Sequence, residues 1–231
     1  MTGPLVVFDV DGTLCDTCEV DEECYVRACG EWLGEEARRL EWSAAPHVTD
    51  QGILEWMSST LLCRRPSARE AREVEARFLD LLRGALDHRP SRFRAIPGAR
   101  PMLDGMASDG WGAVAATGGW RASALLKLRA AALPTDLLAA SSSDTPDRAR
   151  IFELAASRAG AGRDRPERVV LVGDGVWDVR TARELGWGFV GVAAGPRRDR
   201  LREAGAEHVV EDFTDPAALR DALGRAQVPR G

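Results

Sequence analysis

The feature that most limits how this chain can fold is a short apolar run that ends abruptly in acid. Residues 5–8 are all apolar, and Asp9 and Asp11 follow with one residue between them and a glycine after. Because strand side chains alternate between the two faces, both carboxylates point to the same side. Two carboxylates held together repel unless a cation or a proton offsets their charge. The run therefore predicts a buried strand that brings two acids to one edge of a sheet.

The rest of the chain divides into two patterns. After residue 95, strand-like apolar runs alternate with helical stretches, which is typical of a parallel sheet with helices on both faces. We expect strands at 112–116, 137–140, 169–172, 189–192 and 209–210. Helices are expected at 99–107, through 124–131, at 144–159, shortly after residue 175 and near 198–204. Residues 17–94 show only helical periodicity, with helices expected from Val20, over 50–62 and from Ser67. We therefore predict an α/β core of residues 1–16 and 95–231, interrupted by an all-helical cap of residues 17–94.

Polar residues follow three of the expected strands. Asp9 and Asp11 follow the first, Thr117 and two glycines the second, and Asp174 the third, with Asp178 four residues later. The carboxyl ends of parallel strands meet at one edge of the sheet, and ligands bind at this edge in open sheets. The cap would lie above the same edge. Three carboxylates in a chain with only three histidines suit Mg²⁺. A threonine hydroxyl and glycine N–H groups at a helix start suit a phosphoryl group, so the pattern predicts phosphoryl transfer with an aspartate nucleophile.

The composition limits the kinds of partner and substrate that the protein is expected to bind. The net charge of −5 argues against a nucleic-acid partner, which requires a basic face. No apolar run is long enough for a membrane span, and the first residues show no export signal. Five cysteines, an odd number, favour reduced thiols and a cytoplasmic location. We expect a small phosphorylated metabolite as substrate, and a monomer or homodimer.

The three motifs together resemble those of the haloacid dehalogenase superfamily, in its phosphatase branch with a helical cap, which includes phosphoglycolate-phosphatase-like members. The motifs are DVDGT at 9–13, AATG at 115–118 and GDGVWD at 173–178. The resemblance implies a Rossmann-like core in which Asp9 attacks phosphorus and forms an aspartyl-phosphate. Asp11 would protonate the leaving oxygen and then deprotonate the water. The second aspartate also favours phosphate esters over haloacids, whose leaving group needs no proton.

The resemblance also implies a set of binding residues. Mg²⁺ would be held by Asp9, the backbone carbonyl of Asp11 and Asp174, with Asp178 as an outer support. Thr117 and Gly118 would bind the phosphoryl group.

The family also places a basic residue, usually lysine, before the third motif, where this chain has only arginines. We prefer Arg148 to Arg150 because Arg148 lies three residues before the apolar Ile151. An arginine fork can bridge two oxygens, so the replacement is chemically sound. Lys127, the only lysine in the chain, is interpreted as a solvated helix residue.

Several assignments stay open between function and packing. Thr49 and Asp50 precede or begin a cap helix, so they are either an N-cap or substrate-specificity residues. Trp120 and Trp177 lie beside motifs, so they either wall a pocket or pack under loops.

The overall prediction is a Mg²⁺-dependent phosphatase. A phosphomutase of the same fold and a non-catalytic ligand-binding protein are the alternatives.

Overall fold

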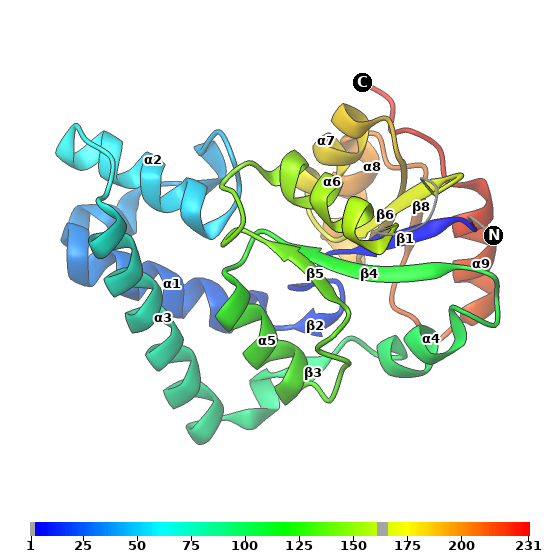
Figure 1. The fold of residues 1–231 in the computed structure, drawn as a ribbon, viewed down its shortest axis with the longest axis horizontal. Coiled ribbons are helices and arrows are strands. Elements are labelled where there is room, and N and C mark those ends of the chain that lie inside the picture. The colour runs from blue at the N-terminus through cyan, green and yellow to red at the C-terminus, as the bar shows by residue number, and fades with distance from the viewer. Residues whose placement is uncertain (1–2, 161–165) are drawn as a thin grey trace.

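The computed structural model describes residues 3–160 and 166–231, and its centre is a six-stranded sheet with helices on both faces (Figure 1). The strands lie in the order β5-β4-β1-β6-β7-β8, and each neighbouring pair is parallel. Their bounds are β1 (Leu5–Phe8), β4 (Gly112–Thr117), β5 (Leu138–Ser141), β6 (Val169–Gly173), β7 (Gly188–Val192) and β8 (His208–Val210). The predicted α/β class with an inserted helical segment is confirmed.

Strand β1 is buried on both faces, which explains its unbroken apolar sequence. Val6 and Phe8 pack into the cluster that includes residues of α4, α5 and α9, whereas Leu5 and Val7 pack with residues of α6, α7 and α8. The first group of helices is α4 (Ala99–Gly105), α5 (Arg121–Ala130) and α9 (Pro216–Arg225). The second is α6 (Arg148–Ala159), α7 (Val176–Leu185) and α8 (Gly195–Glu203).

The inserted segment is helical and has its own apolar cluster, beside the sheet (Figure 1). It contains α1 (Cys18–Leu33), α2 (Asp50–Leu62) and α3 (Ala68–His88), with short 3-10 helices at Glu35–Arg39, Trp42–Ala44 and Pro90–Arg92. Side chains of all three α-helices form this cluster, among them Tyr25, Met57 and Phe78. Ser67 begins α3 with a capping box, because it accepts a hydrogen bond from the Glu70 N–H while the Glu70 carboxylate accepts one from the Ser67 N–H.

A two-stranded antiparallel ribbon joins the insert to the core. It consists of β2 (Cys15–Asp16) and β3 (Arg94–Ala95), with Cys15 opposite Ala95 and Asp16 opposite Arg94. The ribbon lies where we predict the chain to leave and re-enter the core, although the domain limits themselves stay a prediction. In the part of the chain that the structure describes, no helix has both the length and the apolarity to cross a membrane.

Most predicted elements appear within a few residues of their expected limits, and two differ more. Helix α6 begins at Arg148 rather than at residue 144, because the Asp147 side chain caps it by accepting the Arg150 N–H at 3.1 Å. Helix α9 is absent from the prediction, although Asp215 caps it and Pro216 opens it.

Candidate active site

The centre of the sheet positions the residues that follow β1, β4 and β6. β1 lies between β4 and β6, with Phe8 opposite both Ala115 and Val172. Because the three strands end at nearly the same level, Asp9, Thr117 and Asp174 line one cavity. The structure therefore brings together the three strand-end residues that the sequence singles out.

Three carboxylates lie close together at this cavity: Asp9 and Asp174 line it, and Asp178 is fully buried beside them. Oxygens of Asp9, Asp174 and Asp178 lie within 4.8 Å of one another. Burial and the neighbouring Asp178 raise the pKa of Asp9 well above its usual range. The same two causes raise the pKa of Asp174 to about 7. Asp9 and Asp174 therefore bind protons more tightly than ordinary aspartates when no cation is present.

The donor set of this cluster suits a hard divalent cation. Asp9 Oδ1 is buried and has no hydrogen-bond partner among the described residues. Arg148 Nη2 lies 3.4 Å from it, which is ion-pair range but not hydrogen-bond geometry. Carboxylate oxygens alone, with one of them unsatisfied, are the donors that Mg²⁺ prefers. The side chain of Asp178 joins Asp9 and Asp174 in this cluster, whereas the predicted contribution of Asp11 is its main-chain carbonyl.

Asp11 is oriented differently from Asp9 by the turn that follows β1. One oxygen of Asp11 accepts a hydrogen bond from Thr17 Oγ1 at 2.5 Å, and the other lies 2.6 Å from Lys127 Nζ. The turn needs glycine at position 12, because φ is +74° there and a Cβ would overlap the Asp174 carboxylate. The two aspartates of the first motif thus have separate surroundings, as separate chemical roles would require.

Thr117 and Gly118, the predicted phosphoryl-binding residues, line the same cavity as Asp9. Thr117 is buried, and its Oγ1 accepts a hydrogen bond from the Gly119 N–H at 3.0 Å. Position 118 has no room for a side chain, because a Cβ would overlap Arg148 Nη1 and approach the Val48 carbonyl oxygen. The glycine therefore allows a close approach between the β4 loop, α6 and the cap.

Arg148, not Arg150, lies at the site. Its guanidinium is buried and contacts Asp178 Oδ1 at 2.6 Å through Nη2, while Nη1 donates to the Val48 carbonyl at 2.9 Å. Arg150 is exposed and pairs with Glu153. Arg148 begins α6, so the Asp147 cap fixes the point from which it reaches the cavity.

Thr49 and Asp50 attach the cap to the core. Thr49 is the N-cap of α2, accepting the Gly52 N–H at 3.0 Å, and its hydroxyl also donates to the Pro146 carbonyl at 2.7 Å. Asp50 accepts the Trp120 N–H at 2.7 Å, and burial raises its pKa well above the usual range. Both residues line the cavity, so the N-cap prediction and a place beside the substrate are compatible.

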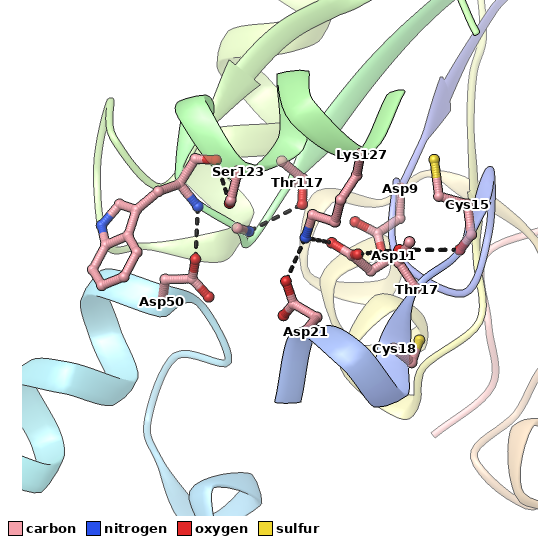
Figure 2. A network of polar contacts seen from close by, with 12 residues as sticks. Asp9, Asp11, Cys15, Thr17, Cys18, Asp21, Asp50, Thr117, Ser123 and Lys127 are labelled. Atoms are coloured by element: carbon pink, nitrogen blue, oxygen red, sulfur yellow. Dashed lines mark hydrogen bonds and ion pairs between the residues drawn. The ribbon is translucent and has the colours of Figure 1, made fainter. Parts of the chain in front are cut away.

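Lys127 corrects the sequence interpretation. It is fully buried rather than solvated, and its Nζ lies 2.6 Å from Asp11 Oδ2 and 2.5 Å from Asp21 Oδ1 (Figure 2). Burial alone would lower the pKa of Lys127, but Asp11 and Asp21 together raise it above its usual value. For Asp21, burial outweighs the opposing effect of Lys127 and raises the pKa to about 6. The sequence did offer one signal, because Lys127 lies on the same stripe of α5 as the buried Ala124 and Leu128.

The upper wall of the cavity is largely apolar. The cavity measures about 310 Å³, and its wall includes Tyr25, Trp42 and Ile53 from the cap and Trp177 from the core. Trp42 and Trp177 approach each other with ring centroids 5.6 Å apart. Trp120 is instead buried against Tyr25 and Phe78, so it packs under the loop. Trp42 and Asp21 were not predicted as site residues, because nothing in their neighbouring sequence marks them as facing the core.

Comparison with known proteins gives a consistent result. The family model described as haloacid dehalogenase-like hydrolase matches residues 4–186. A curated protein named phosphoglycolate phosphatase, from Mesorhizobium japonicum, is 25% identical over 225 residues, covering 92% of each chain.

Solved structures share the fold at low identity. A hydrolase from Pseudomonas syringae superposes with a TM-score of 0.67 at 23% identity, covering 93% of this chain and 95% of the other. A protein described as a candidate beta-phosphoglucomutase from Bacteroides vulgatus gives 0.68 at 18% identity, covering 96% and 91%. At these identities the structural likeness shows the fold alone.

Proposed function

We propose that this chain, which belongs to the haloacid dehalogenase-like hydrolase family, hydrolyses a small phosphate monoester. Asp9 is the proposed nucleophile. One observation carries the proposal. Among the described residues, Asp9 Oδ1 is buried without a hydrogen-bond partner, while both oxygens of Asp11 are engaged by Thr17 and Lys127. Of the two acids, Asp9 has the oxygen left for attack.

Two displacements at phosphorus complete the reaction. A carboxylate oxygen of Asp9 forms a bond to phosphorus as the ester oxygen leaves, and that oxygen takes a proton from Asp11. Water then attacks phosphorus and gives a proton back to Asp11. This attack breaks the acyl-phosphate bond, releases phosphate and restores Asp9. Thr117 and Arg148 are proposed to bind the phosphoryl oxygens during both steps.

A magnesium ion fits the floor of the cavity as part of this proposal. Asp9, Asp174 and the backbone carbonyl of Asp11 would hold it, with Asp178 positioned behind them. When bound, the ion supplies positive charge that offsets the carboxylates and the phosphoryl oxygens. The excess of negative charge in the cluster supports this assignment.

The substrate class is proposed from the cavity and the relatives. A cavity of about 310 Å³ between cap and core admits a small molecule but not a macromolecule. The name of the Mesorhizobium relative supports a small phosphate ester. The cytoplasmic location is an expectation based on the five free cysteines.

A phosphomutase remains the second candidate, because structures described as beta-phosphoglucomutases share the fold. The two candidates differ in what leaves the enzyme. A mutase converts a sugar phosphate to its isomer without releasing phosphate and requires a bisphosphate.

The test is Asp9→Asn, measured by phosphate release from p-nitrophenyl phosphate with Mg²⁺. We expect activity to fall by at least about 10³-fold, because the amide is a poor nucleophile. Asp136→Asn, an exposed aspartate on the loop before β5, is the control and is expected to be fully active. Turnover like that of the unmodified protein in folded Asp9→Asn would overturn the nucleophile assignment.

A further inference from the structure

The chain contains a single lysine among thirty-one basic side chains, and that lysine is fully buried. Lys127 extends from α5, which follows the Thr117 strand, whereas Arg129 in the last turn of the same helix is exposed. Burying an ammonium group is costly unless it is paired and hydrogen-bonded. Its position therefore calls for an explanation in the groups that it contacts.

Lys127 connects two carboxylates from different parts of the molecule. Its Nζ lies 2.6 Å from Asp11 Oδ2, in the turn after β1, and 2.5 Å from Asp21 Oδ1, in the first turns of α1 (Figure 2). Asp11 belongs to the core, whereas α1 belongs to the insert. One ammonium group thus holds the proposed proton carrier against the base of the cap.

The contacts of Asp11 leave its carboxyl group little freedom. Thr17 Oγ1 donates to Oδ1 at 2.5 Å, while Lys127 holds Oδ2. Without Lys127, Oδ2 would lose its charged partner and the carboxyl group could rotate away from Thr17. Proton transfer to a leaving oxygen requires the acid within hydrogen-bond reach, so this orientation matters for the reaction.

We propose that Lys127, anchored by Asp21, is a positioning residue that holds Asp11 where it can protonate the leaving oxygen. The inference rests on the proposed phosphatase reaction and goes beyond it, since it names how the acid is oriented. Lys127 does not touch the phosphoryl group in this proposal; it acts only through Asp11.

The chemistry of the side chain explains why this position has lysine in an arginine-rich chain. An ammonium group is compact and carries three donors that can point in different directions, whereas a guanidinium is larger and planar. Lys127 has no exposed surface, so the extra volume of arginine would displace either Asp11 or Asp21. We therefore expect Lys127→Arg to keep the positive charge but lose the alignment.

A purely structural ion cluster would also explain the contacts, and leaving-group dependence separates the two roles. Proton donation by Asp11 matters little for p-nitrophenyl phosphate, whose leaving group is a weak base. It matters much more for phenyl phosphate, whose leaving group is more basic. A misplaced acid therefore harms the second substrate selectively, whereas general loss of structure lowers both rates equally.

The experiment measures kcat/KM with Mg²⁺ for a series of substituted phenyl phosphates, from p-nitrophenyl to p-methoxyphenyl. For Lys127→Gln and Lys127→Arg we expect a loss of less than about tenfold with the nitrophenyl ester and about 10²-fold with the methoxyphenyl ester. Arg129→Gln, an exposed position on the same helix, is the matched control and should leave every rate unchanged. Circular dichroism reports whether each variant is folded.

Asp21→Asn keeps the inference testable if the lysine variants do not fold. It retains Lys127 beside Asp11 but removes the anchor, so the same selective loss is expected at a smaller size. Asp21→Asn combined with Lys127→Gln should resemble Lys127→Gln alone, since the two residues act through one contact. Equal losses across the series in folded variants, or no loss in any of them, would overturn the inference.

The two proposals fail in different ways. If the unmodified protein releases no phosphate from any ester, the proposed function fails. Suppose instead that the unmodified protein is active, that Asp9→Asn is inactive, and that every Lys127 and Asp21 variant loses the same factor in kcat/KM for all the phenyl phosphates. Then only the positioning role fails.

Discussion

The floor and the upper wall of the cavity differ in chemistry and come mostly from different parts of the chain. The floor is built from the strand-end residues Asp9 and Asp174 of the core, next to the ion pair between Asp178 of α7 and Arg148 of α6. Much of the wall comes from the cap and is apolar, with Tyr25, Trp42 and Ile53 among its members. In the proposed reaction, the core would therefore hold the phosphoryl group, whereas the insert would meet the remainder of the substrate.

The substitution Arg148→Lys is the most severe test of the charged floor and is expected to have the largest effect. A lysine keeps the charge, but its single nitrogen cannot reproduce the spacing of the two guanidinium nitrogens that reach the Val48 carbonyl and Asp178. We expect kcat/KM for p-nitrophenyl phosphate to fall by about 10²-fold, as for the loss of one transition-state donor. Arg150→Lys, two residues along the same helix but exposed, should have no effect. Equal effects of the two substitutions would show that Arg148 is not part of the phosphoryl site.

Metal addition tests the charge of the floor. Mg²⁺ should raise the free energy of unfolding by about 2.7 kcal/mol at a hundredfold excess over Kd, as measured by chemical denaturation. Without metal the pKa of Asp174 is about 7, and only the carboxylate binds the ion. Stabilisation at a fixed Mg²⁺ concentration should therefore grow as pH rises from 6 to 8.

Asp174→Asn is the control for this measurement and should abolish most of the stabilisation. An increase in stability that is larger at pH 6 than at pH 8 would contradict the assignment of the cluster as the metal site.

The upper wall is tested by Trp42→Ala. Trp42 lines the cavity with its ring against that of Trp177, and its Nε1 donates a hydrogen bond to Glu22 at 3.0 Å. Loss of its ring should raise KM for p-nitrophenyl phosphate about tenfold and leave kcat nearly unchanged, because only contacts to the organic group are removed. Competitive inhibition by inorganic phosphate is the internal control and should not change. A matching loss of phosphate affinity would show that wall and floor are not separable.

The smallest expected effect concerns the cap far from the cavity. Ser67→Ala removes the capping box of α3 and should lower the free energy of unfolding by about 1 kcal/mol. Phosphate release should stay unchanged under conditions where the protein is fully folded. A change in KM would mean that the end of α3 influences the wall.

The floor could be predicted from sequence because its geometry follows from the sheet. Asp9, Thr117 and Asp174 each follow a recognisable apolar run, and parallel strands must place such residues at one edge. Helix limits were predictable where the N-cap residue is adjacent and unambiguous, as for α2, whose bounds match the expected 50–62. The start of α6 was not, because the capping Asp147 competes with several other polar residues nearby.

The wall and the buried lysine could not be predicted, since both depend on how the insert sits against the core. Lys127 is polar, so a local pattern favours solvent, and only the approach of α1 supplies Asp21 as its partner. Trp42 lies in a 3-10 helix with no motif beside it, and its role depends on Trp177, which is far away in the sequence. Contacts between segments, rather than periodicity, determine these residues.

The ribbon of β2 and β3 has a consequence for how such a molecule can change over evolution. Cys15 pairs with Ala95, so the chain leaves the core and returns to it at neighbouring points. Everything between the two strands can therefore be lengthened, shortened or exchanged without moving the ends of the core segments. Asp21, Val48 and Asp50 of the insert contact Lys127, Arg148 and Trp120 of the core, so an exchanged segment would also have to supply partners for these three residues.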